Sequence, residues 1–147
     1  MINIQQNFSL SDIENDLNDF EEEIREDLID MLRDAGKAAV DYARMKTRED
    51  GGFGNISYNL RASIGYAIAD SGDLIELYFP SIGKGDHGEA AGKRFAEERA
   101  LSSEFRDCAV LILCAGEKYA AILEAKDKDV ISGSVDEIVD FFNSNLR

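Results

Sequence analysis

Residues 10–46 read LSDIENDLNDFEEEIREDLIDMLRDAGKAAVDYARMK and hold the strongest pattern in the chain. Apolar side chains recur there in steps of three or four residues, at Leu10, Ile13, Leu17, Phe20, Ile24, Leu28, Met31, Ala35, Ala38, Tyr42 and Met45. This spacing predicts one amphipathic helix. Ser11 and Glu14 have the spacing of a capping box, so we expect the helix to start near residue 11.

The predicted helix changes character at Gly36. An unbroken helix to Lys46 would be on the order of 50 Å long, more than a domain of this size can cover. Gly36 is therefore where the helix can bend or break. Small side chains follow it, so the second half can approach a sheet closely, whereas the first half either reaches out to a neighbour or folds back as a separate helix.

Short strands and loops are predicted after this helix. Residues 47–55 are rich in glycine and predict a flexible loop. Alternating apolar residues from Tyr58 to Ile68, the turn at 70–73 and the apolar run 74–79 predict a β-hairpin.

The C-terminal half adds helices and one buried strand. We expect a second glycine-rich loop at 81–88, a helix near 89–104 and a buried strand at 108–115. Residues 119–124 continue as a strand or a short helix. Ser134 and Glu137 form a second capping box before a final helix, whose inward residues are expected to be Val135, Ile138, Val139 and Phe142.

Length and composition predict one domain, and the order of predicted helices and strands places it in the α+β class. The 147 residues are 44% hydrophobic, which suits a single core. Within this domain, residues 1–34 are expected to form an acidic helical arm and residues 35–147 the core of helix and sheet. No apolar run is long enough for a membrane span and the N-terminus lacks the features of a signal peptide, so we expect a cytoplasmic protein.

The formal net charge is −14, and residues 10–36 contribute eleven acids against two bases. Proteins that bind nucleic acid tightly need positive charge, because their affinity comes from Lys and Arg neutralising phosphates. Tight DNA binding is therefore disfavoured. The acids fit a solvated helix face, a surface for a basic partner, or the repulsive lining of a DNA channel.

The two cysteines, Cys108 and Cys114, lie in the same predicted strand. Six residues of extended chain separate them by about 20 Å, too far for a disulfide. We expect two reduced thiols in the core.

Two motifs point to chemistry only weakly. Gly88 to Lys93 resembles a phosphate-binding loop, but its two glycines are one residue too close and Arg94 replaces the Ser or Thr that holds the metal. His87 is the single histidine, so it cannot join a zinc cluster, and no Gly-x-Ser-x-Gly elbow exposes a serine for it to activate.

One enzymatic hypothesis, a nuclease, has a physical basis. Asp107, Glu124 and Lys126 resemble the Asp…Glu-x-Lys core of a nuclease superfamily, in which two carboxylates hold Mg²⁺. The excess of acids would repel the nucleic acid substrate. We therefore expect no catalytic activity, cofactor or metal, with the nuclease as an alternative. A third hypothesis is an acidic protein that imitates DNA and blocks a DNA-binding enzyme.

Two segments of the chain resemble a known family. A helix rich in small residues leads to a glycine turn and to Asn59-Leu-Arg-Ala-Ser-Ile-Gly65, and a later segment reads Gly116-Glu-Lys-Tyr-Ala-Ala-Ile-Leu-Glu124. This order resembles the head-tail joining, or tail-completion, proteins of long-tailed bacteriophages over roughly residues 35–140. The residues that take the family's motif positions are Thr47, Gly52 (or Gly51), Leu60, Arg61, Ser63, Ile64, Tyr119, Ala120 and Glu124.

The resemblance implies a fold and a role. The fold would be a helix packed across a curved antiparallel sheet. The protein would be a virion structural protein that assembles as a homo-oligomeric ring and contacts neck, connector and tail proteins, without a membrane partner. It would be found in the cytoplasm of the bacterial host during assembly and then in the virion.

Overall fold

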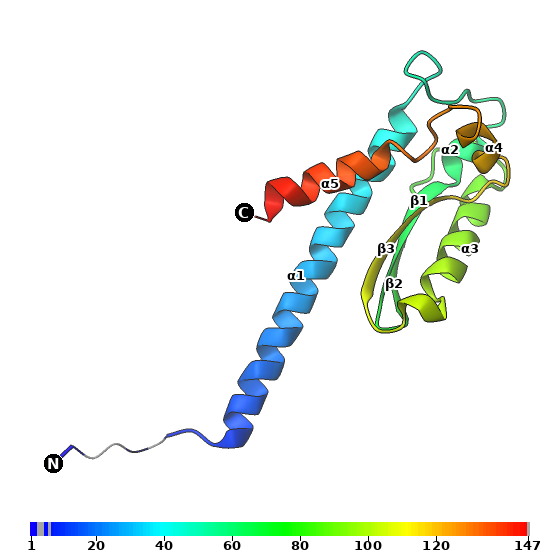
Figure 1. Ribbon diagram of the computed structural model, residues 1–147. Helices are drawn as coiled ribbons and strands as arrows, with labels where there is room; N and C mark the ends of the chain where they lie inside the picture. The colour runs from blue at the N-terminus through cyan, green and yellow to red at the C-terminus, as the bar shows by residue number, and fades with distance from the viewer. Residues whose placement is uncertain (3–4, 6, 147) are drawn as a thin grey trace. The chain divides into compact units, whose positions relative to one another are not determined.

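The computed structural model describes residues 1–2, 5 and 7–146, and it has an α+β fold (Figure 1). By its internal contacts the chain divides into two units, Met1–Met31 and Leu32–Arg147. The first unit is helical from Leu10 onward. The second contains a three-stranded sheet and the remaining helices.

Helix α1, Leu10–Met45, is continuous through Gly36. The break that the sequence allowed at Gly36 is therefore absent. A Cβ atom at Gly36 would lie only 2.8 Å from Cδ1 of Tyr66 and 3.0 Å from Cδ1 of Leu111. The glycine lets the helix backbone approach the sheet, and its neighbours on the same face, Ala35, Ala39, Val40 and Ala43, are buried.

The cap of α1 lies two residues earlier than expected. The Ser9 hydroxyl accepts a hydrogen bond from the Asp12 amide at 3.2 Å, and the Asp12 carboxylate accepts one from the Ser9 amide at 2.7 Å. This reciprocal pair is a capping box. The prediction of Ser11 and Glu14 in this role is wrong, because Ser11 already lies inside the helix.

The sheet is antiparallel with the order β2-β1-β3. Strand β1 is Ile64–Asp70, β2 is Asp73–Tyr78 and β3 is Ala109–Ala115. The predicted hairpin is confirmed: Ser71 and Gly72 both have positive φ angles, +53° and +89°, which a tight two-residue turn requires. The pairing of β1 with β2 shifts register between Ile68 and Ala69, so that Ile75 forms a bulge in β2.

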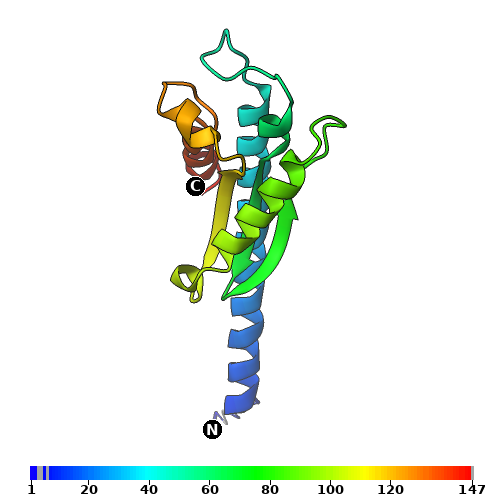
Figure 2. The same cartoon turned by 90° about the vertical axis from the view of Figure 1, so that its right-hand side faces the viewer.

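Helices cover both faces of the sheet (Figure 2). Helix α3, Gly88–Ala100, confirms the predicted helix and packs on one face, where Ala96 and Ala100 join Ala67 and Ala69 of β1 in one cluster. The part of α1 from residue 32 onward lies on the other face, against Tyr66. A 3₁₀ turn, Ser103–Phe105, then precedes β3.

The motif segment at 59–62 is helical rather than extended. Helix α2, Asn59–Ala62, is one turn long and ends directly before β1, so the predicted strand starts at Ile64 instead of Tyr58. Helix α4, Ala120–Glu124, shows that residues 119–124 take the helical alternative.

The last helix, α5, Ser134–Asn145, lacks the predicted capping box. Gly133 is its N-cap, and the buried Ser134 hydroxyl has no hydrogen-bond partner among the described residues. Val135 and Val139, which were expected to face inward, are 55% and 50% exposed. Ile138 and Phe142 are half-buried, so only this side of α5 is covered.

Candidate functional site

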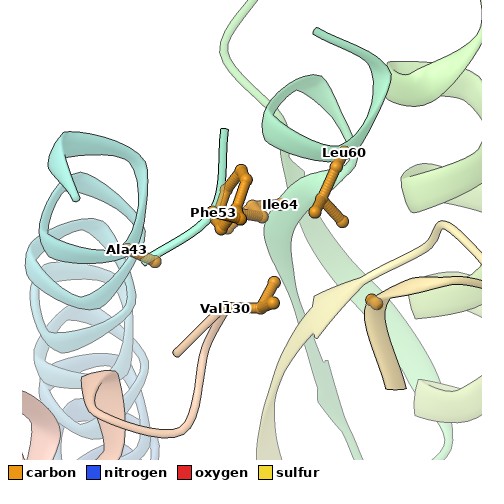
Figure 3. Close-up of a cluster of buried hydrophobic side chains, with 6 residues drawn as sticks. Ala43, Phe53, Leu60, Ile64 and Val130 are labelled. Carbon is orange, nitrogen blue, oxygen red and sulfur yellow. The ribbon is translucent and has the colours of Figure 1, made fainter. Parts of the chain in front are cut away.

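The two motif segments, far apart in the sequence, meet in the structure. Leu60 and Ile64 from the first and Ala120 from the second pack into one buried cluster. Ala43, Phe53 and Val130 complete it, and Figure 3 shows most of these side chains converging from α1, the 47–58 loop and the segment before α5. Phe53 is only 3% exposed, so the glycine-rich loop is anchored by its aromatic side chain.

A pocket of about 640 Å³ lies beside this cluster and has the size of a small-molecule or peptide side-chain site. Four of the motif residues line it: Gly52, Leu60, Arg61 and Tyr119. Its other lining residues come from the same loop and from the C-terminal half: Arg48, Phe53, Gly54, Asn55, Ile56, Ser57, Tyr58, Leu123 and Lys128.

The charge of the pocket is opposite to that of the protein. Arg48, Arg61 and Lys128 line it, and none of its lining residues is acidic, although the chain carries a net charge of −14. Arg61 is held in place because its Nε donates to Asn55 Oδ1 at 2.8 Å and its Nη2 donates to the Lys46 carbonyl at 2.7 Å. Its guanidinium lies 4.9 Å from the centre of the Phe53 ring. The pocket is thus suited to an anionic group attached to an apolar body.

Tyr58 stands at the pocket in a strained backbone conformation. Its φ angle is +62°, a left-handed value that bulky residues rarely adopt. Such a conformation costs on the order of 1–3 kcal/mol, and strain of this kind is often stored at functional sites. Tyr58 is the N-cap of α2, the helix that carries Leu60 and Arg61.

Three motif residues hold local turns and do not line the pocket: Thr47, Ser63 and Glu124. The Thr47 hydroxyl donates to Asp50 Oδ2 at 2.7 Å and closes the turn after α1. The buried Ser63 hydroxyl donates to the Leu60 carbonyl at 2.8 Å.

Glu124 organises the chain between α4 and α5. Its Oε1 accepts hydrogen bonds from the amides of Val130, Ile131 and Ser132 at 3.0, 2.8 and 3.1 Å. Its Oε2 accepts one from the Ser132 hydroxyl at 2.7 Å. Burial acts to raise the pKa of Glu124, but these donors outweigh it and hold the pKa below its usual value.

The residues of the nuclease hypothesis are not brought together. Asp107 precedes β3, beside the hairpin turn, where the Cys108 carbonyl accepts from the Ser71 amide. Glu124 follows the opposite end of β3 and belongs to α4 rather than to a strand. Among the described residues, no group of three His, Cys, Asp or Glu side chains could hold a metal ion.

The glycines of the phosphate-loop motif are used for packing. Cβ atoms at Gly88 and Gly92 would lie 2.0 Å from the Asn59 carbonyl oxygen and 2.5 Å from the Ser63 carbonyl oxygen. They let α3 touch α2 and the start of β1. His87 is largely exposed, with its Nε2 3.6 Å from Glu117 Oε1.

The cysteines differ from each other. Cys114 is buried as expected, and burial raises the pKa of its thiol to about 12. Cys108 is exposed, so its predicted burial is wrong: β3 begins one residue later than expected and leaves Cys108 in the preceding turn. Both thiols are free.

The two edges of the sheet are unequal. The β2 edge carries the bulge at Ile75 and the acids Asp73 and Glu76, features that protect an edge strand from pairing. Strand β3 reads AVLILCA, without charge, proline or bulge. Within the described part of the chain, its backbone bonds only to β1, so its other edge is open.

Several pocket residues were not singled out by sequence reasoning, namely Arg48, Phe53, Tyr58 and Lys128. Their clustering has no signature in local spacing, because residues 48–61 and 119–128 are joined only by the fold. No protein-family model matches this chain, and no curated protein or solved structure matches it either. No helix among the described residues is long and apolar enough to cross a membrane.

Proposed function

We propose that this protein is a structural subunit of a bacteriophage virion that acts in head-tail joining or tail completion as part of a ring. It works by contact with its own copies and with neck, connector or tail proteins, in the host cytoplasm and then in the virion, and it has no enzymatic activity. The order of the motif segments supports this proposal. So does the α+β fold, with a helix packed on an antiparallel sheet, which the resemblance implies.

The open edge of β3 is the observation that carries the proposal. Seven apolar residues offer a row of backbone donors and acceptors to a further strand, without any of the usual protective features. Natural proteins rarely leave such an edge uncovered unless another chain pairs with it.

The proposed ring requires β3 to pair with a different surface of the next copy. The bulge makes the β2 edge a poor partner for β3, whereas β3 paired with β3 of a second copy would give a two-fold dimer instead of a ring. Contacts between two different surfaces are head-to-tail and close into a ring when the rotation between subunits permits.

The test combines mass, shape and amide exchange. Light scattering across a concentration series should show a growing mass, and electron microscopy of the concentrated protein should show closed rings. Hydrogen exchange should slow in residues 109–115 as the mass grows, because pairing protects the outer amides of β3.

Two matched variants locate the contact. Leu113→Lys adds a charge to the strand with the open edge, at a half-buried position, whereas Ile75→Lys adds one to the strand with the protected edge, at an exposed position. Only the first should prevent assembly, with folding of both checked by circular dichroism. A protein that stays monomeric at every concentration, with and without tail proteins, would contradict the proposed ring.

A genetic experiment addresses the phage role itself. Deleting the gene from the phage or prophage that carries it should leave filled heads and separate tails. The wild-type gene should restore joined particles and the Leu113→Lys gene should not. Normal virions from the deletion strain would contradict the proposal.

A further inference from the structure

The first unit of the chain exposes a long apolar stripe on α1. The exposed fractions of Leu10, Ile13, Leu17, Phe20 and Ile24 range from 39% to 79%. Single exposed apolar residues are ordinary, but five aligned on one helix face are not. The stripe has the character of a surface that another molecule covers.

The spacing of the apolar residues indicates what kind of element can pack on the stripe. The five residues alternate in steps of three and four over two heptads, the spacing of the a and d positions that form the seam of a left-handed coiled coil. Such a seam is narrow and fits one further helix. The opposite face of α1 is polar, with Asn15, Asn18 and Glu22.

The residues beside the seam define the charge of the partner. Glu14, Asp16, Glu21 and Glu23 occupy the flanking e and g positions, and all four are exposed acids. Flanking residues in a coiled coil meet those of the partner helix and decide which partner is accepted.

A second copy of this helix is a poor occupant. In a parallel pair Asp16 would face Glu21 of the other copy, and in an antiparallel pair the acids would also meet acids. Like charges at these positions oppose pairing. Helix α5 has the same problem, because its polar residues include Asp136, Glu137 and Asp140 and no base.

We propose that the acidic seam, defined as Leu10, Ile13, Leu17, Phe20 and Ile24 with their four flanking acids, binds an amphipathic helix of another protein whose flanking residues are Lys or Arg. Apolar contact along the seam supplies most of the affinity, and the charges select the partner and its orientation. This inference does not depend on the phage role.

The test uses the full-length protein and three synthetic peptides of three heptads. The first has Ile and Leu at its a and d positions and Lys at e and g. The second has the same composition in an order that scatters the apolar residues, and the third has Glu at e and g. Only the first should bind in fluorescence anisotropy and gain helix on binding.

Variants of the protein separate the apolar and charged contributions. Leu17→Ala with Phe20→Ala should weaken binding by about 100-fold, because it removes two large side chains from the seam. Glu14→Gln, Asp16→Asn and Glu23→Gln together should weaken it by roughly tenfold at low salt. Asp19→Asn, Glu22→Gln and Glu26→Gln remove the same charge from the outer face and should change it little.

Three outcomes would overturn the proposal. Equal binding of the scattered peptide would mean that charge alone attracts it, as for a protein that imitates DNA. An equal loss of affinity in the flanking and outer-face charge variants would also mean that net charge alone attracts the peptide. Failure of the first peptide to bind would also overturn it, and an oligomer that Leu17→Ala and Phe20→Ala dissolve would then show that a second copy covers the seam.

Discussion

Arg44 near the end of α1 binds the backbone at the start of β1, where its Nη2 donates to the Ile64 carbonyl at 2.6 Å. The same guanidinium also donates to the carbonyls of Ala62 at 3.2 Å and Pro80 at 2.5 Å. One side chain therefore joins the helix, the motif segment and the end of the hairpin. Burial lowers the pKa of Arg44.

Replacing Arg44 should destabilise the core strongly. Arg44→Ala leaves three carbonyls without their donor, and we expect it to lower the free energy of unfolding by about 2–4 kcal/mol in urea titrations. Arg44→Lys should retain less than half of the stabilisation that Arg44→Ala loses, because an ammonium group lacks the planar fork of donors that reaches several acceptors. A Lys variant as stable as the wild type would show that charge alone is needed.

Glu76 should make stability depend on pH. It accepts from Arg33 Nε at 2.5 Å and from the Tyr66 hydroxyl at 2.8 Å. Burial acts to raise the pKa of Glu76, but these bonds outweigh it and keep the pKa below its usual value. The stabilisation is therefore complete above the unfolded pKa of about 4.3 and is lost as pH falls through the lower folded pKa.

Glu76→Gln is the matching variant. It should cost about 1–3 kcal/mol at neutral pH and show a weaker loss of stability on acidification than the wild type. Glu97→Gln, an exposed glutamate on α3, is the control and should keep the wild-type profile. Parallel acid profiles for Glu76→Gln and the wild type would exclude this network as the cause.

Glu124 should matter for folding and not for nuclease chemistry. Glu124→Ala removes the acceptor of three amides and one hydroxyl, so we expect a loss of about 2–4 kcal/mol in unfolding free energy. Lys126→Ala, at an exposed position, should change stability by less than about 0.5 kcal/mol. Mg²⁺-dependent DNA cleavage that both variants abolish would instead support the nuclease.

Gly36 should not tolerate alanine, although alanine favours helices. The new Cβ would meet the Tyr66 ring at 2.8 Å and Leu111 at 3.0 Å. Overpacking of this kind costs about 1–3 kcal/mol, which exceeds the gain of roughly 1 kcal/mol in helix propensity. Asp34→Ala, at an exposed position on the same helix, should be neutral or slightly stabilising in the same thermal melts.

The errors of sequence reasoning have physical causes at particular residues. Alternation from Tyr58 indicated a strand, but a left-handed Tyr58 starts a helical turn at 59–62 that local pattern does not reveal. Ser134 and Glu137 have capping-box spacing, yet Gly133 caps the helix and Ser134 is buried in it. Motif spacing states which hydrogen bond is possible, and packing decides which one forms.

Local periodicity and turn chemistry were enough to predict several elements of this protein. These are the long amphipathic helix with its acidic first half, the hairpin at 70–73, helix α3 and strand β3. Helix and strand periods involve residues two to four positions apart, so they can be read along the chain.

Four features could not be predicted without the fold: the continuity of α1 at Gly36, the four hydrogen bonds to Glu124, the open edge of β3 and the basic pocket. Three of them depend on contacts between residues more than four positions apart in sequence, and the open edge depends on β3 having no second strand beside it in the described residues. Arg61 and Lys128 reach the same pocket because Leu60, Ile64 and Ala120 share one buried cluster. Burial of apolar surface brings such segments together, and it is non-directional, so local spacing does not encode which charges meet.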